Sequence, residues 1–308
     1  MQQSATVRPV VTVVGSFTPS VVLDLARSTG ALSDVGLTVD EVPVTSSPGQ
    51  FRSLLSDELH VGLTSPDNVL AYRFSPSNPL GSTLDVRIVS AVDRGMGLGL
   101  YGRPGATAAD LRGARVGVDV PVSGFALALY ALASGLGVSR SDYSLEALGS
   151  TPQRLKALLA GECDATMLNA GNELVAEDAG CVRLASAAES LSPYLGTVVA
   201  VAGTAHLAEA RALAAALTTV GDRILDGSLT EEAAESAARR LGLSDSLAVR
   251  YVERLREPTD GLVRGGTVDR AALQNLIHLR TTWLPEVVDG RDVMANALAE
   301  GSGLVDEV

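Results

Sequence analysis

Four dipeptides that pair a hydroxyl side chain with proline are the first candidates for chemistry in this sequence. Each stands at the start of a helical pattern, where the hydroxyl can cap free backbone N–H groups and proline loses no hydrogen bond. In an open α/β sheet such turns lie at the carboxyl ends of the strands, where ligands bind. Capping alone accounts for any one dipeptide, whereas the set indicates a binding cleft. The four are Thr18-Pro19, Ser47-Pro48, Ser65-Pro66 and Thr151-Pro152.

Three further positions could contact a ligand directly. Asp67 and Asp93 could each pair with an amine or amidine. Asp67 could equally be a first-turn residue favoured by the helix dipole, and Asp93 could pair with the neighbouring Arg94. Ser123-Gly124 follows a strand-like run and could present a helix N-terminus to an anionic or carbonyl group.

The sequence lacks the patterns typical of catalytic or metal sites. His60, His206 and His278 are far apart along the chain and form no metal-binding motif. His60 precedes an apolar run, so we interpret it as a structural histidine. The chain contains no Gly-x-Ser-x-Gly elbow, phosphate loop or dinucleotide motif. We therefore expect no metal and no cofactor, and we assign no catalytic residue.

The chain repeats itself once. Residues 47–58 align without a gap on residues 151–162, and residues 86–91 are echoed by 182–187. Two copies favour two similar lobes, since solenoids need three or more stacked units. A cleft between the lobes is then the natural place for function. The register puts Ser65 and Asn169 at equivalent strand ends that face this cleft.

Composition narrows the class of protein. The chain has 308 residues, 46% hydrophobic and 19% charged, which is ample for sizeable cores. A net charge of -12 opposes binding to nucleic acid or to anionic lipid. No run of 18 apolar residues predicts a membrane span. Residues 1–9 lack the pattern of a secretory signal. The compartment therefore stays open: extracytoplasmic if a signal was trimmed, cytoplasmic if Met1 is the true start.

The predicted elements alternate between strands and helices until about residue 203, which indicates mainly parallel sheets covered on both faces. Strands are predicted at 10–14, 38–44, 61–63, 86–92, 115–119, 143–148, 164–168 and 182–186. Helices are predicted between them at 19–28, 48–56, 66–74, 123–136, 152–160 and 172–179. A helical tail follows at 206–225, 230–241, 244–254 and 268–284.

Two glycine-bounded apolar segments, 96–102 and 195–203, flank the second copy and are interpreted as crossovers between the lobes. The first lobe is thus expected to comprise residues 1–97 and 198–308, and the second residues 98–197. Cys163 and Cys181 both precede apolar runs. They could form a disulfide or remain two small buried thiols.

The sequence resembles the periplasmic-binding-protein-like type II fold, in the group related to thiamine-pyrimidine-precursor, alkanesulfonate and nitrate solute-binding proteins. Three segments carry the resemblance: 54–67, which ends in Val-Gly-Leu-Thr-Ser-Pro-Asp, 109–118, which reads Ala-Asp-Leu-Arg-Gly-Ala-Arg-Val-Gly-Val, and 158–165, which holds Gly-Glu-Cys-Asp-Ala. His60 departs from the family, which commonly has an aspartate there. The export signal or lipoprotein cysteine of importer-serving members is not visible. Nor are the cysteine motifs of the enzymes on this scaffold.

The resemblance implies a cleft lined by strand ends and crossovers from both lobes. The implied ligand-binding residues are Ser16, Phe17, Thr45, Ser46, Thr64, Ser65, Asp67, Asp93, Ser123, Gly124, Phe125, Asn169 and Asn172. Hydroxyls, amides and helix N-termini suit directed hydrogen bonding to a carboxylate, sulfonate or amide. We therefore expect a monomeric solute-binding protein that closes on a small polar organic ligand and serves an ABC-type permease. The alternative is a cytosolic enzyme on the same scaffold.

Overall fold

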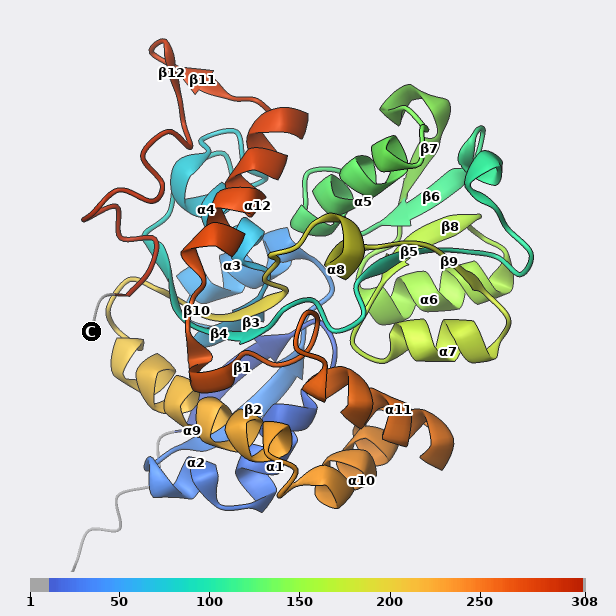
Figure 1. Ribbon diagram of the computed structural model, residues 1–308. Helices are drawn as coiled ribbons and strands as arrows, with labels where there is room; N and C mark the ends of the chain where they lie inside the picture. The colour runs from blue at the N-terminus through green and yellow to red at the C-terminus, as the bar shows by residue number, and fades with distance from the viewer. Residues whose placement is uncertain (1–10, 307–308) are drawn as a thin grey trace, which may run out of the picture.

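The computed structural model describes residues 11–306 and contains two five-stranded sheets, each covered by helices (Figure 1). The first sheet has the order β2-β1-β3-β10-β4, formed by Thr38–Pro43, Val11–Ser16, Val61–Thr64, Thr197–Ala202 and Val86–Asp93. The second has the order β7-β6-β8-β5-β9, formed by Ser144–Ala147, Arg115–Val118, Ala165–Leu168, Gly99–Gly102 and Val182–Ser186. Residue 10, the first of the predicted strand 10–14, lies outside the described residues.

The two sheets share one topology, so the internal repeat does correspond to two similar lobes. In each sheet four strands run in the same direction, and the strand that is fourth in the order runs antiparallel to both of its neighbours. That antiparallel strand is β10 in the first lobe and β5 in the second. Both lie within the segments interpreted as crossovers. The chain therefore passes between the lobes just before β5 and just before β10. We call residues 94–98 and 187–196 the first and second crossing segments, and each leads directly into its antiparallel strand.

The expected lobe boundaries can be placed on this topology. The boundary between residues 97 and 98 falls between β4 and β5, and the boundary between residues 197 and 198 falls between the first two residues of β10.

Cys163 and Cys181 are buried free thiols, so the disulfide alternative is wrong. Burial raises the pKa of both thiols.

The helices follow the predicted pattern with small shifts at their ends. They are α1 (Val21–Ser28), α3 (Ser47–Leu55), α4 (Pro66–Phe74), α5 (Gly124–Gly135), α6 (Thr151–Ala160) and α7 (Asn172–Asp178). Two one-turn helices were not predicted, α2 (Ala31–Asp34) and α8 (Ala187–Ser190).

The capping prediction is correct for one of the four dipeptides. Ser65 Oγ accepts the N–H of Asp67 at 3.3 Å and caps α4. In the other three, a serine beside the dipeptide is the N-cap: Ser20 for α1, Ser46 for α3 and Ser150 for α6. Proline then falls in the first turn of α3 and α6, where its missing N–H costs nothing.

The tail is helical, as predicted, and returns to the first lobe. Its helices are α9 (Leu207–Leu225), α10 (Thr230–Leu241), α11 (Asp245–Arg256) and α12 (Arg270–Trp283), followed by the small hairpin of β11 (Val287–Val288) and β12 (Arg291–Asp292). Ile88 of β4 exchanges backbone hydrogen bonds with Leu304 and Asp306, so the chain end extends the first sheet. Helix α12 lies beside α5 of the second lobe (Figure 1). Among residues 11–306, no helix is both long and apolar enough to cross a membrane.

Candidate functional site

A cavity of about 130 Å³ lies between the two sheets and draws its walls from both lobes. The carboxyl ends of parallel strands meet there, since Ser16 ends β1, Thr64 ends β3, Asp119 follows β6 and Asn169 follows β8. The crossing segments and the strand ends beside them close one side. The crossing segments contribute Met96 and Gly196, and the adjoining ends of β4 and β10 contribute Asp93 and Thr197. We call this space the inter-lobe cavity.

Four helices begin at the wall of the inter-lobe cavity, two from each lobe. They are α1 with Ser20 and Val21, α4 with Ser65, α5 with Ser123 and Gly124, and α6 with Thr151. First-turn N–H groups have no intrahelical partner, and the helix dipole is positive at this end. In α5, Ser123 Oγ accepts the N–H of Ala126 at 3.2 Å. The preceding Gly124 and Phe125 N–H groups have no partner within residues 11–306. These helix starts therefore favour negative charge.

Arg154 brings a full positive charge to the same wall. Its side chain is 2% exposed and lies on the first turn of α6. The guanidinium donates to neutral oxygens: Gly149 O at 2.5 Å, Thr151 Oγ1 at 2.9 Å, and Met167 O at 3.3 Å from Nη2. No carboxylate lies within ion-pair distance of it in the described part of the chain. Burial lowers the pKa of Arg154, the charge of the nearby Asp119 raises it, and the guanidinium stays protonated in proteins. A buried charge without an ionic partner is costly, and a bound anion would offset that cost.

Sequence reasoning missed Arg154, although the repeat holds the signal. The gapless alignment pairs Arg154 with Gln50. Gln50 is also buried, and its Nε2 donates to Gly15 O at 3.1 Å and Leu63 O at 3.2 Å. Leu63 and Met167 are themselves repeat equivalents, so both side chains tie a helix to the same strand end. The second lobe therefore keeps the structural hydrogen bond and adds a charge that the first lobe lacks.

Two acids also face the cavity, one from each side. Asp119 accepts a short hydrogen bond from Ser123 Oγ at the start of α5. Asp93 accepts the N–H of Gly95 at 2.8 Å, and burial raises the pKa of its carboxyl to about 6. The alternative in which Asp93 pairs with Arg94 is not realised, because Arg94 Nη1 donates to Leu262 O at 2.6 Å. Asp119 and Asp93 are acceptors for any N–H or O–H group that a ligand carries.

Nine of the thirteen predicted site residues line the inter-lobe cavity: Ser16, Phe17, Thr64, Ser65, Asp93, Ser123, Gly124, Phe125 and Asn169. Several have their polar atoms committed to the protein. Ser16 donates its hydroxyl to Glu41 at 2.6 Å, and Asn169 Nδ2 donates to Gly95 O at 3.1 Å. These two side chains therefore fix the shape of the wall, while helix N-termini supply open donors and Arg154 supplies a positive charge.

The other four predicted residues do not line the cavity, each for a local reason. Ser46 caps α3 by accepting the N–H of Gly49, and Thr45 beside it is exposed. Asn172 donates to Asn169 O at 2.9 Å and so braces the loop behind the wall. Asp67 is buried in an ion pair with Arg280 of α12. Both sequence interpretations of Asp67, amine partner and first-turn residue, left out this partner 213 residues away.

The first crossing segment is held by buried acids. Asp260 Oδ1 accepts the N–H of Gly97 at 2.8 Å, and Met96 adopts a positive φ of 54°. Glu173 lies against Gly97 and is 0% exposed; its Oε1 accepts no hydrogen bond in the described residues and lies 4.0 Å from Arg254 Nε. Burial raises the pKa of Glu173 to about 8. The crossing segment therefore packs on a carboxyl group that prefers to stay neutral.

We predict that this carboxyl makes the protein less stable as pH rises. A raised pKa means that the unfolded chain releases its proton first, so the free energy of unfolding falls with pH between the two pKa values. One such group costs about 1.4 kcal/mol per pH unit. From about pH 6 to about pH 8, above the Asp93 pKa, Glu173→Gln should remove that slope in urea denaturation. Glu146→Gln, at an exposed acid on β7 that does not act on Glu173, should keep it. Equal slopes in wild type and Glu173→Gln would refute the assignment.

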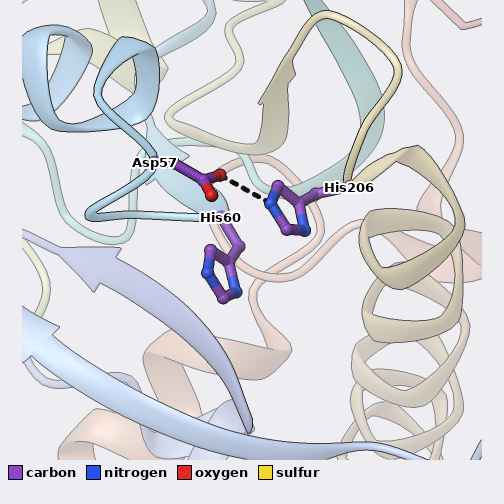
Figure 2. Close-up of side chains that lie close together, drawn as sticks. All are labelled: Asp57, His60 and His206. Atoms are coloured by element: carbon purple, nitrogen blue, oxygen red, sulfur yellow. Dashed lines mark hydrogen bonds and ion pairs between the residues drawn. The ribbon is translucent and has the colours of Figure 1, made fainter. Parts of the chain in front are cut away.

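Two histidines that the sequence separates come together outside the cavity. The rings of His60 and His206 stack with centroids 4.1 Å apart at 9°, and His206 Nε2 lies 2.7 Å from Asp57 Oδ1 (Figure 2). The sequence argument from spacing thus missed a cluster of potential metal ligands. Because the two imidazole rings stack in parallel, the nitrogen lone pairs of one ring lie in a different plane from those of the other. In this arrangement they do not point at a common metal position. Val13 N–H also donates to His60 Nδ1 at 3.1 Å, which is the structural role predicted for His60.

Comparison with known proteins places this geometry in context. A family model described as "ABC transporter, phosphonate, periplasmic substrate-binding protein" matches residues 32–244. None of the curated protein sequences matches the chain. Among solved structures, the alkanesulfonate-binding protein SsuA from Xanthomonas axonopodis pv. citri, bound to MOPS, is similar with a TM-score of 0.69 and 16% identity, covering 90% of this chain and 93% of that one.

Two further structures have the same fold. The periplasmic aliphatic sulphonate binding protein SsuA from Escherichia coli gives a TM-score of 0.66 at 18% identity, covering 89% of this chain and 87% of that one. A conserved Candida albicans gene product with the generic periplasmic binding protein fold gives 0.69 at 16% identity, covering 97% and 96%. At these identities the likeness shows the fold, which is the one that the sequence resemblance implied.

Proposed function

The chain belongs to the family of phosphonate substrate-binding proteins of ABC transporters, and from this membership we propose that its inter-lobe cavity binds a small organic oxyanion. Members of this family bind small solutes and work with ABC transporter permeases. Membership therefore favours a solute-binding role over the enzyme alternative. The class of ligand that the cavity selects is inferred from the charges and the hydrogen-bond donors of its wall.

Arg154 is the single observation that carries the proposal. The guanidinium is 2% exposed, and four of its five N–H groups donate to neutral protein oxygens. One hydrogen on Nη1 stays without a partner within residues 11–306 and can donate to a phosphonate, sulfonate or carboxylate oxygen, whose charge the buried cation favours. The N-terminus of α5 supports it, because Gly124 and Phe125 offer unpartnered N–H groups at the same cavity.

The rest of the wall suggests what the oxyanion is attached to. Phe17, Val21, Leu63, Met96 and Leu255 are apolar and line the same space. A volume of about 130 Å³ admits a small organic molecule. Asp119 and Asp93 disfavour a purely anionic ligand and favour one that also carries an N–H or O–H donor.

A panel of ligands of matched size tests the proposal by isothermal titration calorimetry. Ethylphosphonate and ethanesulfonate should bind at least about tenfold more tightly than propylamine, because a tenfold difference in affinity corresponds to the free energy of one hydrogen bond to a charged group. 2-Aminoethylphosphonate should bind more tightly than ethylphosphonate, because its ammonium group meets the two acids. Equal or tighter binding of propylamine would refute an oxyanion site.

A further inference from the structure

A buried ion pair joins the C-terminal helix to the first lobe beside the cavity. Arg280 of α12 is 5% exposed and Asp67 of α4 is 1% exposed. The pair is bidentate, with Nε 2.9 Å from Oδ1 and Nη2 2.5 Å from Oδ2. Bidentate geometry fixes the plane of the guanidinium, so the remaining donor direction of Nη2 is fixed as well.

That remaining donor reaches the second lobe. Arg280 Nη2 donates to the backbone oxygen of Val122 at 3.1 Å. Val122 directly precedes Ser123, the N-cap of α5, and the open N–H groups of Gly124 and Phe125 follow. The lobes touch at this point, because a Cβ built on Gly124 would lie 2.7 Å from Asp67 Cβ. One guanidinium therefore contacts an acid of the first lobe and the anion-facing turn of the second.

Helix α12 contacts the second lobe and its crossing segment at other points too. Trp283, at its end, packs on Tyr130 of α5 with ring centroids 5.8 Å apart. Asn275 Nδ2 donates to Leu191 O at 2.5 Å and to Pro193 O at 3.2 Å, both in the second crossing segment. The helix therefore spans the side of the molecule where α4 and α5 meet.

We propose that Arg280 is a positioning residue that shifts the balance between open and closed lobes toward the closed arrangement and sets the α5 N-terminus against the ligand. The inference builds on the proposed function. If the lobes separate, the Asp67–Arg280 pair stays within the first lobe, whereas the bond to Val122, the Gly124–Asp67 contact and the Trp283–Tyr130 contact are lost. Arg280 thus favours the closed form and stabilises the same turn that receives the oxyanion.

The test replaces both partners together. Asp67→Asn with Arg280→Gln leaves no uncompensated buried charge, so the fold is expected to persist, and it removes the rigid donor to Val122. Arg73→Gln is the matched control. Arg73 pairs with Asp85 and donates to Val86 O and Ser302 O. The Arg73→Gln variant therefore loses a similar network, but one that lies entirely within the first lobe.

Spin labels at two exposed repeat-equivalent sites, Leu55 and Leu159, report the distance between lobes by double electron–electron resonance. The double variant should shift the ligand-free distribution to longer distances and the Trp283 emission toward that of an exposed indole. It should also bind ethylphosphonate about tenfold more weakly. Arg73→Gln should match wild type throughout. Distances and emission equal to wild type in the double variant would overturn the proposal.

Failure of the proposed function gives a different result. If ethylphosphonate does not bind wild type, the oxyanion assignment is wrong. The role of Arg280 is still decided by the ligand-free distances and the Trp283 emission.

Discussion

Replacing Arg154 with glutamine is expected to weaken binding of ethylphosphonate by on the order of 100-fold, because it removes the partner of a desolvated charge. Glutamine is the residue that the first lobe uses at the equivalent position, where Gln50 bonds to Gly15 O and Leu63 O. The substituted side chain can therefore tie α6 to Met167 O as Gln50 ties α3 to Leu63 O. The fold should persist while the charge is lost.

Lys156→Gln is the control for Arg154→Gln. Lys156 is exposed on the same helix and does not line the cavity, so its loss changes the net charge equally without touching the site. Calorimetry should show wild-type affinity for the lysine variant, and urea denaturation should show folded protein for both. If Arg154→Gln binds ethylphosphonate as wild type does, Arg154 is not the anion partner.

Gly124→Val is expected to weaken binding by a factor between about 5 and 150, the cost of overpacking a tight contact by about 1 to 3 kcal/mol. Sequence reasoning attributes such a loss to a blocked approach of the ligand to the α5 N-terminus. The structure gives a different cause. A side chain here would meet Asp67 Cβ at 2.7 Å and its Oδ2 at 3.0 Å, so the lobes could not close.

Small-angle scattering separates the two causes. With saturating ethylphosphonate, wild type should compact and Gly124→Val should not. Gly135→Val, at the other end of the same helix, should behave as wild type, because a Cβ added there would meet open space. Compaction of Gly124→Val to the wild-type radius with weakened binding would instead support a blocked approach.

The fold could be predicted from the sequence because its signals are local or repeated. Strand-sized apolar runs, helix starts and a gapless repeat define two lobes before any coordinates are known. The antiparallel strand in each sheet could not be predicted, because β5 and β10 obtain their partners from tertiary pairing. At three of the four helix starts the proline marks the start of the helix, but the hydroxyl residue paired with it is not the cap. A neighbouring serine takes the N-cap position instead.

The site was predictable where it follows strand ends and not where it depends on distant partners. Ser65, Asn169 and Ser123 line the inter-lobe cavity because their strands or helices end there. Asp67 was assigned to the ligand because nothing near it in sequence indicates Arg280. His60 and His206 meet because two loops converge, which spacing along the chain cannot show.

The most direct test of the central claim is native mass spectrometry of wild type and Arg154→Gln, each incubated with one equimolar mixture of ethylphosphonate, ethanesulfonate, propionate and propylamine. The account predicts one oxyanion per wild-type chain, recovered chemically unchanged, and a much smaller bound fraction for Arg154→Gln. Equal occupancy of the two proteins, retention of propylamine, or recovery of an altered molecule would contradict it.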